Sequence, residues 1–307
     1  MSHADKSVTE TISVHGKDHL IMEKNYRAEL TGVFGDPVEG NPTGVMEEAA
    51  YEAAGLNFRY ITMKVTPEDF PDAMKAVRAL HMKVINLTMP HKIAVIPYLD
   101  ELSEAASIIG AVNTVVVRED GSLFGENTDG KGFIEALLRY GEHPQGKNIV
   151  ILGAGGAARA IAVECALAGA AKITVVNRSG AKACELAGLI HEKTSVPADA
   201  LDWTPGMEIP SGTDILINAT SIGLGDDRAN KPDICYETVS PSMTVSDVVF
   251  NPSDTLFLKE AAARGAKTIS GLGMLACQGA RNFTLWTCTE APLDVMIGKL
   301  KEEFGEV

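Results

Sequence analysis

The sequence predicts an α/β protein of two domains, the larger of which is built on a doubly wound parallel sheet. Two observations support this. Short apolar runs alternate with helical patterns through the second half of the 307-residue chain, as a parallel sheet requires. A separate set of strands and helices, a smaller α/β domain, precedes a glycine-rich turn near residue 153. We expect a cleft between the two domains to hold a ligand.

The smaller domain is predicted over residues 29–130, after a polar stretch, 1–28, that has no clear period and forms an extension. Pro67 suits the first turn of a helix, and Phe70, Met74 and Val77 then share one face. The predicted elements are a strand at 30–34, a helix at 46–54, a strand at 58–65, a helix at 67–80, a strand at 83–87 and a hairpin of 112–117 with 122–124.

The larger domain is predicted over residues 131–273, and a helix at 130–140 leads into it. Its strands are expected at 149–152, 173–176, 215–219, 244–249 and 267–270, with helices at 181–190 and 256–264 between them. Helices at 274–287 and 292–303 follow the last strand. We expect this C-terminal part, 274–307, to return to the smaller domain and complete it.

The stretch from Ile149 to Arg178 has the pattern of a Rossmann-type βαβ unit, which binds a dinucleotide. Glycines in its turn let the backbone approach a pyrophosphate, and the N–H groups at the start of the helix then face that anion. Ala158 takes the third small position of the motif. The turn residues predicted to bind the cofactor are Gly153, Ala154, Gly155, Gly156 and Ala157.

The end of the second strand of this unit predicts NADP rather than NAD. An NAD site usually carries Asp or Glu there, whereas this chain has Asn177, Arg178 and then Lys182. An arginine can pair with a 2′-phosphate through two hydrogen bonds, and a nearby lysine adds positive charge. The alternative is a solvated arginine at a strand end.

Composition excludes several classes of protein. A net charge of -14 argues against a nucleic-acid partner. The five cysteines are scattered, with no Cys/His cluster at metal spacing, so we predict no metal site and a reducing, cytoplasmic location. No signal peptide or membrane-spanning run is evident, and the oligomeric state, monomer or homodimer, stays open.

Three polar segments in the smaller domain suit a polyhydroxylated small molecule, because Asn and Thr both donate and accept hydrogen bonds. They are residues 86–92, 111–114 and 126–130, which lie at strand ends and at the junction of the two domains. A lysine and an aspartate among them could move a proton.

Together with these segments, seven ordered motifs closely resemble the shikimate/quinate dehydrogenase family. They are NLTMPHK, GAVNTVV, ENTDG, ILGAGGAARA, VVNRS, INATSIG and GLGMLACQGARNFTLW. The resemblance implies reversible hydride transfer between a ring carbon of shikimate or quinate and NADP or NAD.

The resemblance also implies roles for individual residues. Lys92 and Asp129 match the catalytic pair, in which Lys serves acid–base transfer and Asp shares the reacting hydroxyl, while His91 is expected to be structural. Positions that hold the substrate match Asn86, Thr88, Asn113 and Gln278. Positions around the nicotinamide match Thr220, Ser221, Val248, Gly271 and Met274.

The chain departs from the family pattern at one end of the substrate site. The usual Ser-Lys-Ser segment is replaced by Asn41, Pro42 and Thr43, whose amide and hydroxyl could still hold a carboxylate. Glu47-Glu48 replaces a common His-Asn and is expected to add negative potential there. Phe250 stands where Tyr is frequent, which removes a hydroxyl from the pocket.

We therefore expect an NADP-dependent oxidoreductase that oxidises a ring hydroxyl of shikimate or of a close cyclic hydroxy acid. The alternatives are a quinate or amino-analogue dehydrogenase, a reductase of a ketone that lacks a carboxylate, and a dinucleotide-binding relative without turnover.

Overall fold

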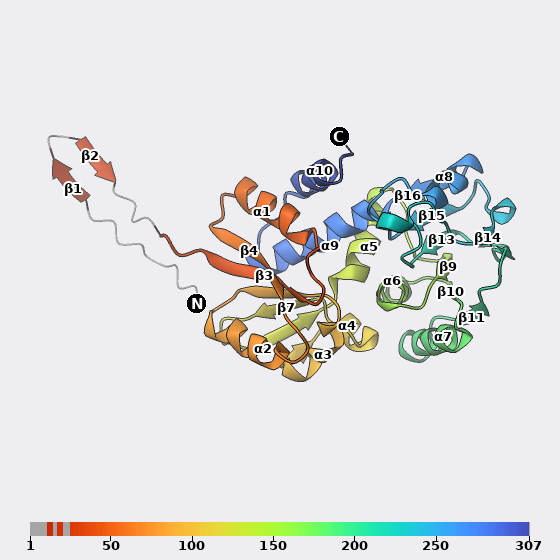
Figure 1. Cartoon of the computed structure of the whole chain (residues 1–307), viewed down its shortest axis with the longest axis horizontal. Coiled ribbons are helices and arrows are strands. Elements are labelled where there is room, and N and C mark those ends of the chain that lie inside the picture. The colour runs from red at the N-terminus through yellow and green to blue at the C-terminus, as the bar shows by residue number, and fades with distance from the viewer. Residues whose placement is uncertain (1–10, 15–16, 21–24, 307) are drawn as a thin grey trace.

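The described residues form two six-stranded sheets and two smaller sheets, β1-β2 and β12-β14. Figure 1 shows the two halves of the molecule that the large sheets build. The computed structural model describes residues 11–14, 17–20 and 25–306. The first sheet has the order β4-β3-β5-β7-β8-β6, and the second has the order β11-β10-β9-β13-β15-β16. The α/β class predicted from the sequence is confirmed.

The first sheet mixes parallel and antiparallel pairs. Its strands are β3 (Glu29–Gly35), β4 (Phe58–Lys64), β5 (Val84–Leu87), β6 (Glu101–Leu102), β7 (Thr114–Val117) and β8 (Leu123–Glu126). Its helices in the first part of the chain are α1 (Thr43–Ala53), α2 (Phe70–Ala79), α3 (His91–Ala94) and α4 (Glu104–Ile109). Two helices from the end of the chain, α9 (Gly271–Thr287) and α10 (Leu293–Glu303), pack on it as well.

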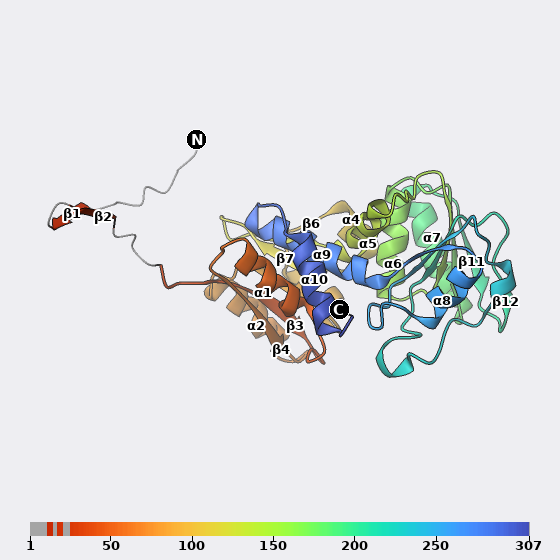
Figure 2. The ribbon, with the colours of Figure 1, turned by 90° about the horizontal axis from the view of Figure 1, so that it is seen from above.

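Helices cover both faces of this first sheet (Figure 2). On one face, Val33 and Val84 pack against Phe283 of α9 and Met296 of α10. On the other face, the alternate strand residues Phe34, Ile85 and Leu87 pack against α2. The face under α1, α9 and α10 also carries the polar side chains of the candidate site.

The second sheet is wholly parallel and doubly wound. Its strands are β9 (Asn148–Leu152), β10 (Lys172–Asn177), β11 (Ala198–Asp202), β13 (Ile215–Asn218), β15 (Thr244–Asp247) and β16 (Lys267–Ile269). Its helices are α6 (Gly156–Leu167), α7 (Gly180–Thr194) and α8 (Leu256–Ala263). The chain winds outward from β9 in both directions, which leaves a switch point between β9 and β13 where such sheets bind ligands.

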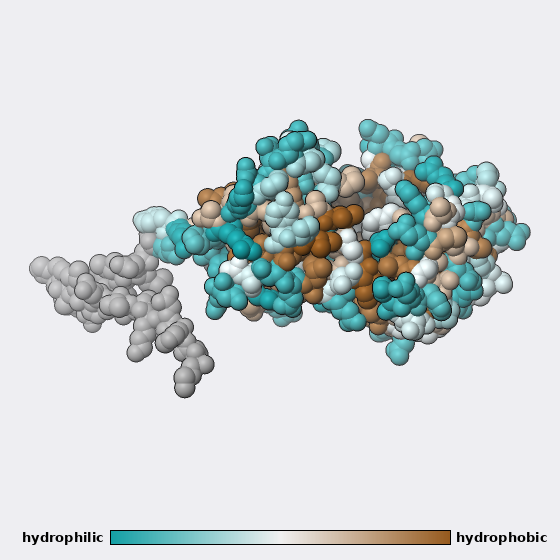
Figure 3. All heavy atoms as spheres, turned by 90° about the horizontal axis from the view of Figure 1, so that it is seen from below, coloured by the Kyte–Doolittle hydropathy of each residue, from teal (hydrophilic) through white to brown (hydrophobic). Residues whose placement is uncertain are grey.

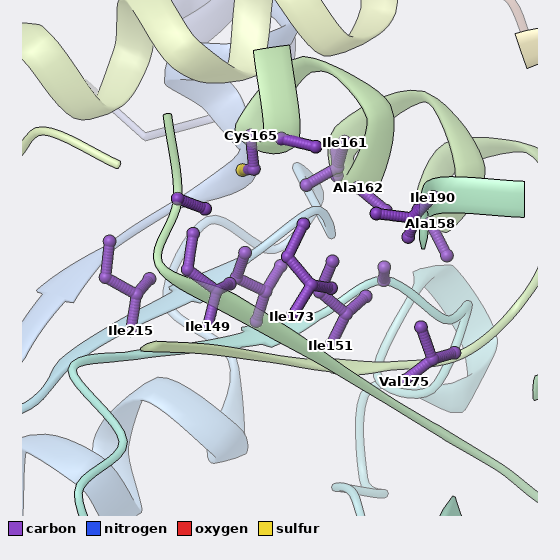
Figure 4. Close-up of a cluster of buried hydrophobic side chains, with 14 of the residues drawn as sticks. Ile149, Ile151, Ala158, Ile161, Ala162, Cys165, Ile173, Val175, Ile190 and Ile215 are labelled. Carbon is purple, nitrogen blue, oxygen red and sulfur yellow. The ribbon is translucent and has the colours of Figure 1, made fainter. Parts of the chain in front are cut away.

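Branched side chains of β9 and β10 form the core beneath α6 (Figure 4). Ile149 and Ile151 lie beside Ile173 and face Ile161 and Cys165 of α6. Val150 and Leu152 point to the opposite face and pack under α8, so β9 is buried on both sides. That burial explains why its sequence reads as an unbroken apolar run.

Helix α5 (Thr128–Arg139) connects the two sheets and packs closely on both sides. A Cβ atom at Gly130 would lie 2.4 Å from the carbonyl oxygen of Ala160 in α6. A Cβ atom at Gly132 would lie 2.6 Å from the backbone nitrogen of Gln278 in α9. These two glycines therefore let three backbones approach to distances that no other residue permits.

Several predicted boundaries were wrong. Helix α1 begins at Thr43 rather than at 46, α2 begins at Phe70 rather than at 67, and α5 begins at Thr128 rather than at 130. Helix α7 runs on to Thr194, and α9 begins at Gly271 rather than at 274. The strands β6, β11, β12 (Met207–Glu208) and β14 (Ile234–Cys235), the helices α3 and α4, and the short 3-10 turns at Ile96–Tyr98, Gly225–Asp227 and Tyr236–Thr238 were not predicted.

Within the extension predicted at 1–28, two strands, β1 (Thr11–Val14) and β2 (Lys17–Leu20), pair antiparallel. The rest of that prediction, up to residue 24, lies outside the described residues. Over the described part of the chain, no helix has both the length and the apolar character needed to cross a bilayer.

Candidate active site

Lys92 and Asp129 form an ion pair at the junction of the two sheets. Lys92 lies in α3, just after β5, and Asp129 is the second residue of α5, just after β8. Lys92 Nζ donates to Asp129 Oδ2 over 2.6 Å. The two side chains are 31% and 20% exposed, so a small molecule can reach the pair. One N–H of the ammonium is used in this contact, and two remain for a ligand.

Asn113 holds the second oxygen of the same carboxylate. Its Nδ2 donates to Asp129 Oδ1 over 2.7 Å, and its Oδ1 accepts from the Thr128 amide over 2.8 Å. Asn127 caps the helix, because its Oδ1 accepts from the Asp129 amide. Asp129 is therefore fixed at both oxygens and at its backbone, which directs its charge at Lys92.

A buried hydrogen-bond network leads from this pair toward α9. Thr128 Oγ1 donates to Asn282 Oδ1 over 2.9 Å, and Asn282 Nδ2 donates to Gln278 Oε1 over 3.2 Å. Gln278 was predicted as a site residue, whereas Thr128 and Asn282 were missed. Gln278 and Asn282 are four residues apart and therefore lie on one face of the helix. This spacing is the sequence feature from which Asn282 could have been predicted.

A second branch of the network leads toward β4. Asn86 Nδ2 donates to the Asn113 carbonyl over 3.2 Å, and the Tyr60 hydroxyl donates to Asn86 Oδ1 over 2.8 Å. Asn86 and Asn113 were predicted as site residues and Tyr60 was not. The network therefore brings together five of the predicted residues: Lys92, Asp129, Asn86, Asn113 and Gln278.

Thr88 and His91 lie beside Lys92 in different roles. Thr88 packs so closely on β3 that a Cβ atom at Gly35 would lie 2.3 Å from its methyl group. The His91 ring stacks on Phe70, and its Nε2 lies 2.7 Å from the Val65 carbonyl oxygen. His91 is thus buried in structural contacts, as predicted.

Asn41 and Thr43 lie at the start of α1. Asn41 Oδ1 accepts from the Thr43 amide over 2.9 Å, so its Nδ2 is the group left to donate to a ligand. A groove of 930 Å³ beside α1 and β4 is lined by Asn41 and Tyr60 but by neither Lys92 nor Asp129. That groove is also lined by Lys299, Glu48 and Glu52, but the described residues that line it include no lysine–aspartate pair like that of Lys92 and Asp129.

The structure does not support the negative potential expected from Glu47. Glu47 is fully buried, and burial raises its pKa well above the usual range, which favours the neutral acid. Neither of its carboxyl oxygens has a hydrogen-bond partner among the described residues. Glu48 instead accepts from the Tyr60 backbone amide and ties α1 to β4.

The glycine-rich turn lies at the switch point between β9 and β13. Gly153 has φ 115°, and a Cβ atom there would lie 2.9 Å from the Ala219 carbonyl oxygen. A Cβ atom at Gly155 or Gly156 would meet nothing within 4 Å, so the start of α6 is open to a ligand. The other predicted residues of these two strand ends are Ala154, Ala157, Thr220 and Ser221.

Arg178 lines a separate pocket of 330 Å³ beyond the end of β10, together with Trp203 and Lys231. Asn177 Nδ2 donates to the Ser179 carbonyl oxygen over 3.0 Å. Lys182 is exposed in α7 and is not among the residues that line this pocket. The structure therefore brings Arg178 to the pocket and leaves Lys182 outside it.

The remaining predicted residues gather after β15. A Cβ atom at Gly271 would lie 2.4 Å from the Val248 carbonyl oxygen, and Met274 packs on the core below α6. Phe250 packs its ring against Phe304, with centroids 5.6 Å apart. Beside them, the amide and hydroxyl of Ser253 donate to the Glu306 carboxylate over 2.8 and 2.6 Å.

Asp247, at the end of β15, is hydrogen-bonded to the segment that follows this strand. It accepts hydrogen bonds from Asn218 Nδ2, from the Val249 amide and from Thr255 Oγ1. Burial raises the pKa of Asp247 to about 6, and these hydrogen bonds oppose the rise.

Apolar residues lie along the junction between the two halves of the molecule on the face in Figure 3. Across the described ranges, no cluster of His, Cys, Asp and Glu is arranged to hold a metal.

Family models of shikimate dehydrogenases match most of the chain. The substrate-binding domain of shikimate dehydrogenase matches residues 33–115, shikimate/quinate 5-dehydrogenase matches residues 136–223, and the shikimate 5'-dehydrogenase C-terminal domain matches residues 271–301.

Individual proteins are similar over nearly their whole length. The NADP+ shikimate dehydrogenase of Desulforamulus reducens is 40% identical and spans 92% of this chain and 98% of its own. The 5-ketofructose reductase of Gluconobacter sp. strain CHM43 is 48% identical, with a TM-score of 0.88 over 91% of this chain and 100% of its own. A shikimate dehydrogenase solved with NADP+ is 39% identical, with a TM-score of 0.83 over 91% of this chain and 97% of its own.

Proposed function

Because this chain belongs to the shikimate dehydrogenase family, we propose that it is an NADP-dependent dehydrogenase that interconverts a ring hydroxyl of shikimate, or of a close polyhydroxylated relative, with the ketone. The observation that carries the proposal is the Lys92–Asp129 pair, 2.6 Å apart and partly open to solvent. A chain that only bound a dinucleotide would not need this pair.

Lys92 moves the proton in this mechanism. In the direction of reduction, its ammonium donates a hydrogen bond to the substrate ketone and gives up a proton as the oxygen becomes a hydroxyl. In the direction of oxidation, the neutral amine takes that proton back. Asp129 accepts from Lys92 on one oxygen and from Asn113 on the other, and so keeps Lys92 aimed at the reacting oxygen.

The residues present fit NADP. The open start of α6 offers backbone N–H groups and the positive end of the helix to a pyrophosphate. Arg178 lines the pocket after β10 and offers a guanidinium to a 2′-phosphate. When bound, the nicotinamide supplies or accepts a hydride.

A second candidate substrate is the neutral sugar ketone 5-ketofructose, which the 48% identical relative reduces by its name. The observation that favours it is the composition of residues 41–47, the segment in which the chain departs from the family pattern. Pro42 replaces the lysine of the family pattern, Glu47 is buried and favours its neutral form, and Asn41 and Thr43 are uncharged. Uncharged donors and acceptors suit hydroxyl groups, whereas a carboxylate binds more strongly to a cation.

Initial rates decide between the two substrates. NADP+ and NAD+ are each tested with shikimate and quinate, and NADPH and NADH are each tested with 5-ketofructose. Turnover of shikimate with NADP+ supports the first substrate, and turnover of 5-ketofructose alone, with NADPH, supports the second. No turnover of any compound, with NADPH still bound, overturns the enzymatic proposal.

We further propose the cytoplasm as the location, which the five free cysteines support. We also propose the division at residues 28, 130 and 273, of which residue 130 lies inside α5 and residue 273 lies inside α9. The strands of one six-stranded sheet all precede α5 and those of the other all follow it, which supports this division.

A further inference from the structure

Tyr60 contacts the candidate substrate residue Asn86 and is not itself one of the predicted site residues. Its side chain comes from β4, at the edge of the first sheet, and is 8% exposed. Its hydroxyl donates to Asn86 Oδ1 over 2.8 Å. Asn86 is itself 6% exposed, so water cannot readily replace this contact.

The contacts around Asn86 settle which way its amide points. The Asn113 carbonyl can only accept, so the nitrogen of the Asn86 amide must face it, 3.2 Å away. The oxygen of the amide then faces the Tyr60 hydroxyl. The other N–H of the Asn86 amide has no hydrogen-bond partner among the residues that the structure describes.

Burial keeps Tyr60 in the form that donates. Burial raises the pKa of Tyr60 well above the usual range, and a contact with the Thr43 side chain opposes part of the rise. The hydroxyl therefore stays protonated at any pH at which the protein works. Glu47 stands where the family pattern has a histidine, so the environment of Tyr60 in this chain differs from that pattern.

The same contacts join Tyr60 to the ion pair. Asn86 donates to the Asn113 carbonyl, and the Asn113 side chain donates to Asp129. Tyr60, Asn86, Asn113 and Asp129 thus form one continuous hydrogen-bonded chain from the sheet edge to the reacting centre.

We propose that Tyr60 is a positioning residue that acts through Asn86, and that it holds the amide so that its free N–H donates to an oxygen of the substrate. This inference rests on the proposed function and concerns the binding of one oxygen of the substrate. Loss of the Tyr60 hydroxyl leaves Asn86 Oδ1 buried without a donor, and the amide is then free to rotate.

The first test is Tyr60→Phe, assayed with shikimate and with 5-ketofructose. A hydrogen bond to substrate that is equal in the ground and transition states affects KM and leaves kcat unchanged. We expect KM to rise about tenfold, which corresponds to about 1.4 kcal/mol, with kcat within about twofold of the wild type. The matched control is Tyr51→Phe, because Tyr51, in α1, is also buried and its hydroxyl pairs with Thr31 over 2.9 Å rather than with Asn86.

A double-mutant cycle tests whether the effect passes through Asn86. In an Asn86→Ala background, Tyr60→Phe is expected to change KM no further. The proposal is overturned if Tyr60→Phe leaves KM unchanged in the wild-type background, or if it raises KM by the same factor when Asn86 is absent.

A readout that needs no turnover separates this proposal from the proposed function. The side-chain NH2 signals of Asn86 in a ¹⁵N-labelled sample are identified by their loss in Asn86→Ala. They should shift in Tyr60→Phe and stay in place in Tyr51→Phe. Unmoved signals in Tyr60→Phe refute the positioning role, whereas a wild type that turns over neither compound refutes only the function.

Discussion

Gly130 sets how closely α5 can approach α6, and Gly130→Ala tests what that approach does for catalysis. An added Cβ atom would lie 2.4 Å from the Ala160 carbonyl oxygen and 2.6 Å from Glu164 Cγ. Ordinary contact between such atoms begins near 3.4 Å, so the two helices have to separate by about 1 Å. Asp129 precedes Gly130 directly and moves with the helix.

A displacement of about 1 Å is enough to break the hydrogen bond between Lys92 and Asp129. Lys92 and Asp129 are 2.6 Å apart, and an added 1 Å takes the contact beyond about 3.2 Å, the limit for a good hydrogen bond. We expect kcat to fall about 10²-fold, the usual cost of such a misplacement. Alanine gains about 1 kcal/mol of helix propensity, and overpacking costs about 1–3 kcal/mol, so the free energy of unfolding should fall by about 1 kcal/mol.

Initial rates and urea denaturation measure the two effects, and Gly188→Ala is the matched control. Gly188 lies inside α7, is exposed, and a Cβ atom there meets nothing within 4 Å. Gly188→Ala should raise the free energy of unfolding by about 1 kcal/mol and leave kcat unchanged. If Gly130→Ala stabilises the protein as Gly188→Ala does and keeps its kcat, the reasoning about close packing is refuted.

Four further predictions follow from the site. Lys92→Ala should lower kcat by a factor of about 10² to 10⁴ while NADPH still binds, as measured by initial rates and by nucleotide fluorescence; a near wild-type rate would contradict the catalytic role. Arg178→Ala should raise KM for NADPH about tenfold or more and leave KM for NADH unchanged, and equal effects on both would remove the 2′-phosphate assignment. Asn41→Ala and Thr43→Ala should each raise KM for the substrate far more than they lower kcat, so an unchanged KM in both excludes them from binding. Burial raises the pKa of Asp247 from 3.8 to about 6, so its contribution to stability is complete below pH 3.8 and is lost as the pH rises through 6. Relative to Asp247→Asn, the free energy of unfolding of the wild type should fall by up to about 3 kcal/mol between those values, and urea denaturation at each pH that shows no such difference would reject the assignment.

The fold class could be predicted because the strands of the second sheet are buried on both faces. The segment from Asn148 to Leu152 carries four buried apolar residues in a row, which is typical of a central parallel strand. Strand β11 escaped prediction because it lies at the sheet edge, where its residues are exposed or half-buried and need not be apolar. Helix α1 was started too late because Thr43 and Gly44 resemble turn residues.

The candidate site was predicted where short motifs carry it and missed where distant segments meet. Lys92, Asn113 and Asp129 each stand in a compact polar motif after or before a strand. Thr128 and Asn282 are 154 residues apart in the chain, and no local pattern indicates that they pair. The neutral state of Glu47 likewise depends on its burial, which only the packing of α1 on the first sheet reveals.

The return of α9 and α10 to the first sheet has a consequence for the order in which the chain matures on the ribosome. The apolar face of the first sheet is covered by Phe283, Trp286, Met296 and Leu300, which are synthesised after every strand of both sheets. The second sheet is complete once residue 269 has emerged. We therefore expect the nucleotide-binding half to be able to fold during translation, before α9 and α10 have emerged to cover the core face of the first sheet.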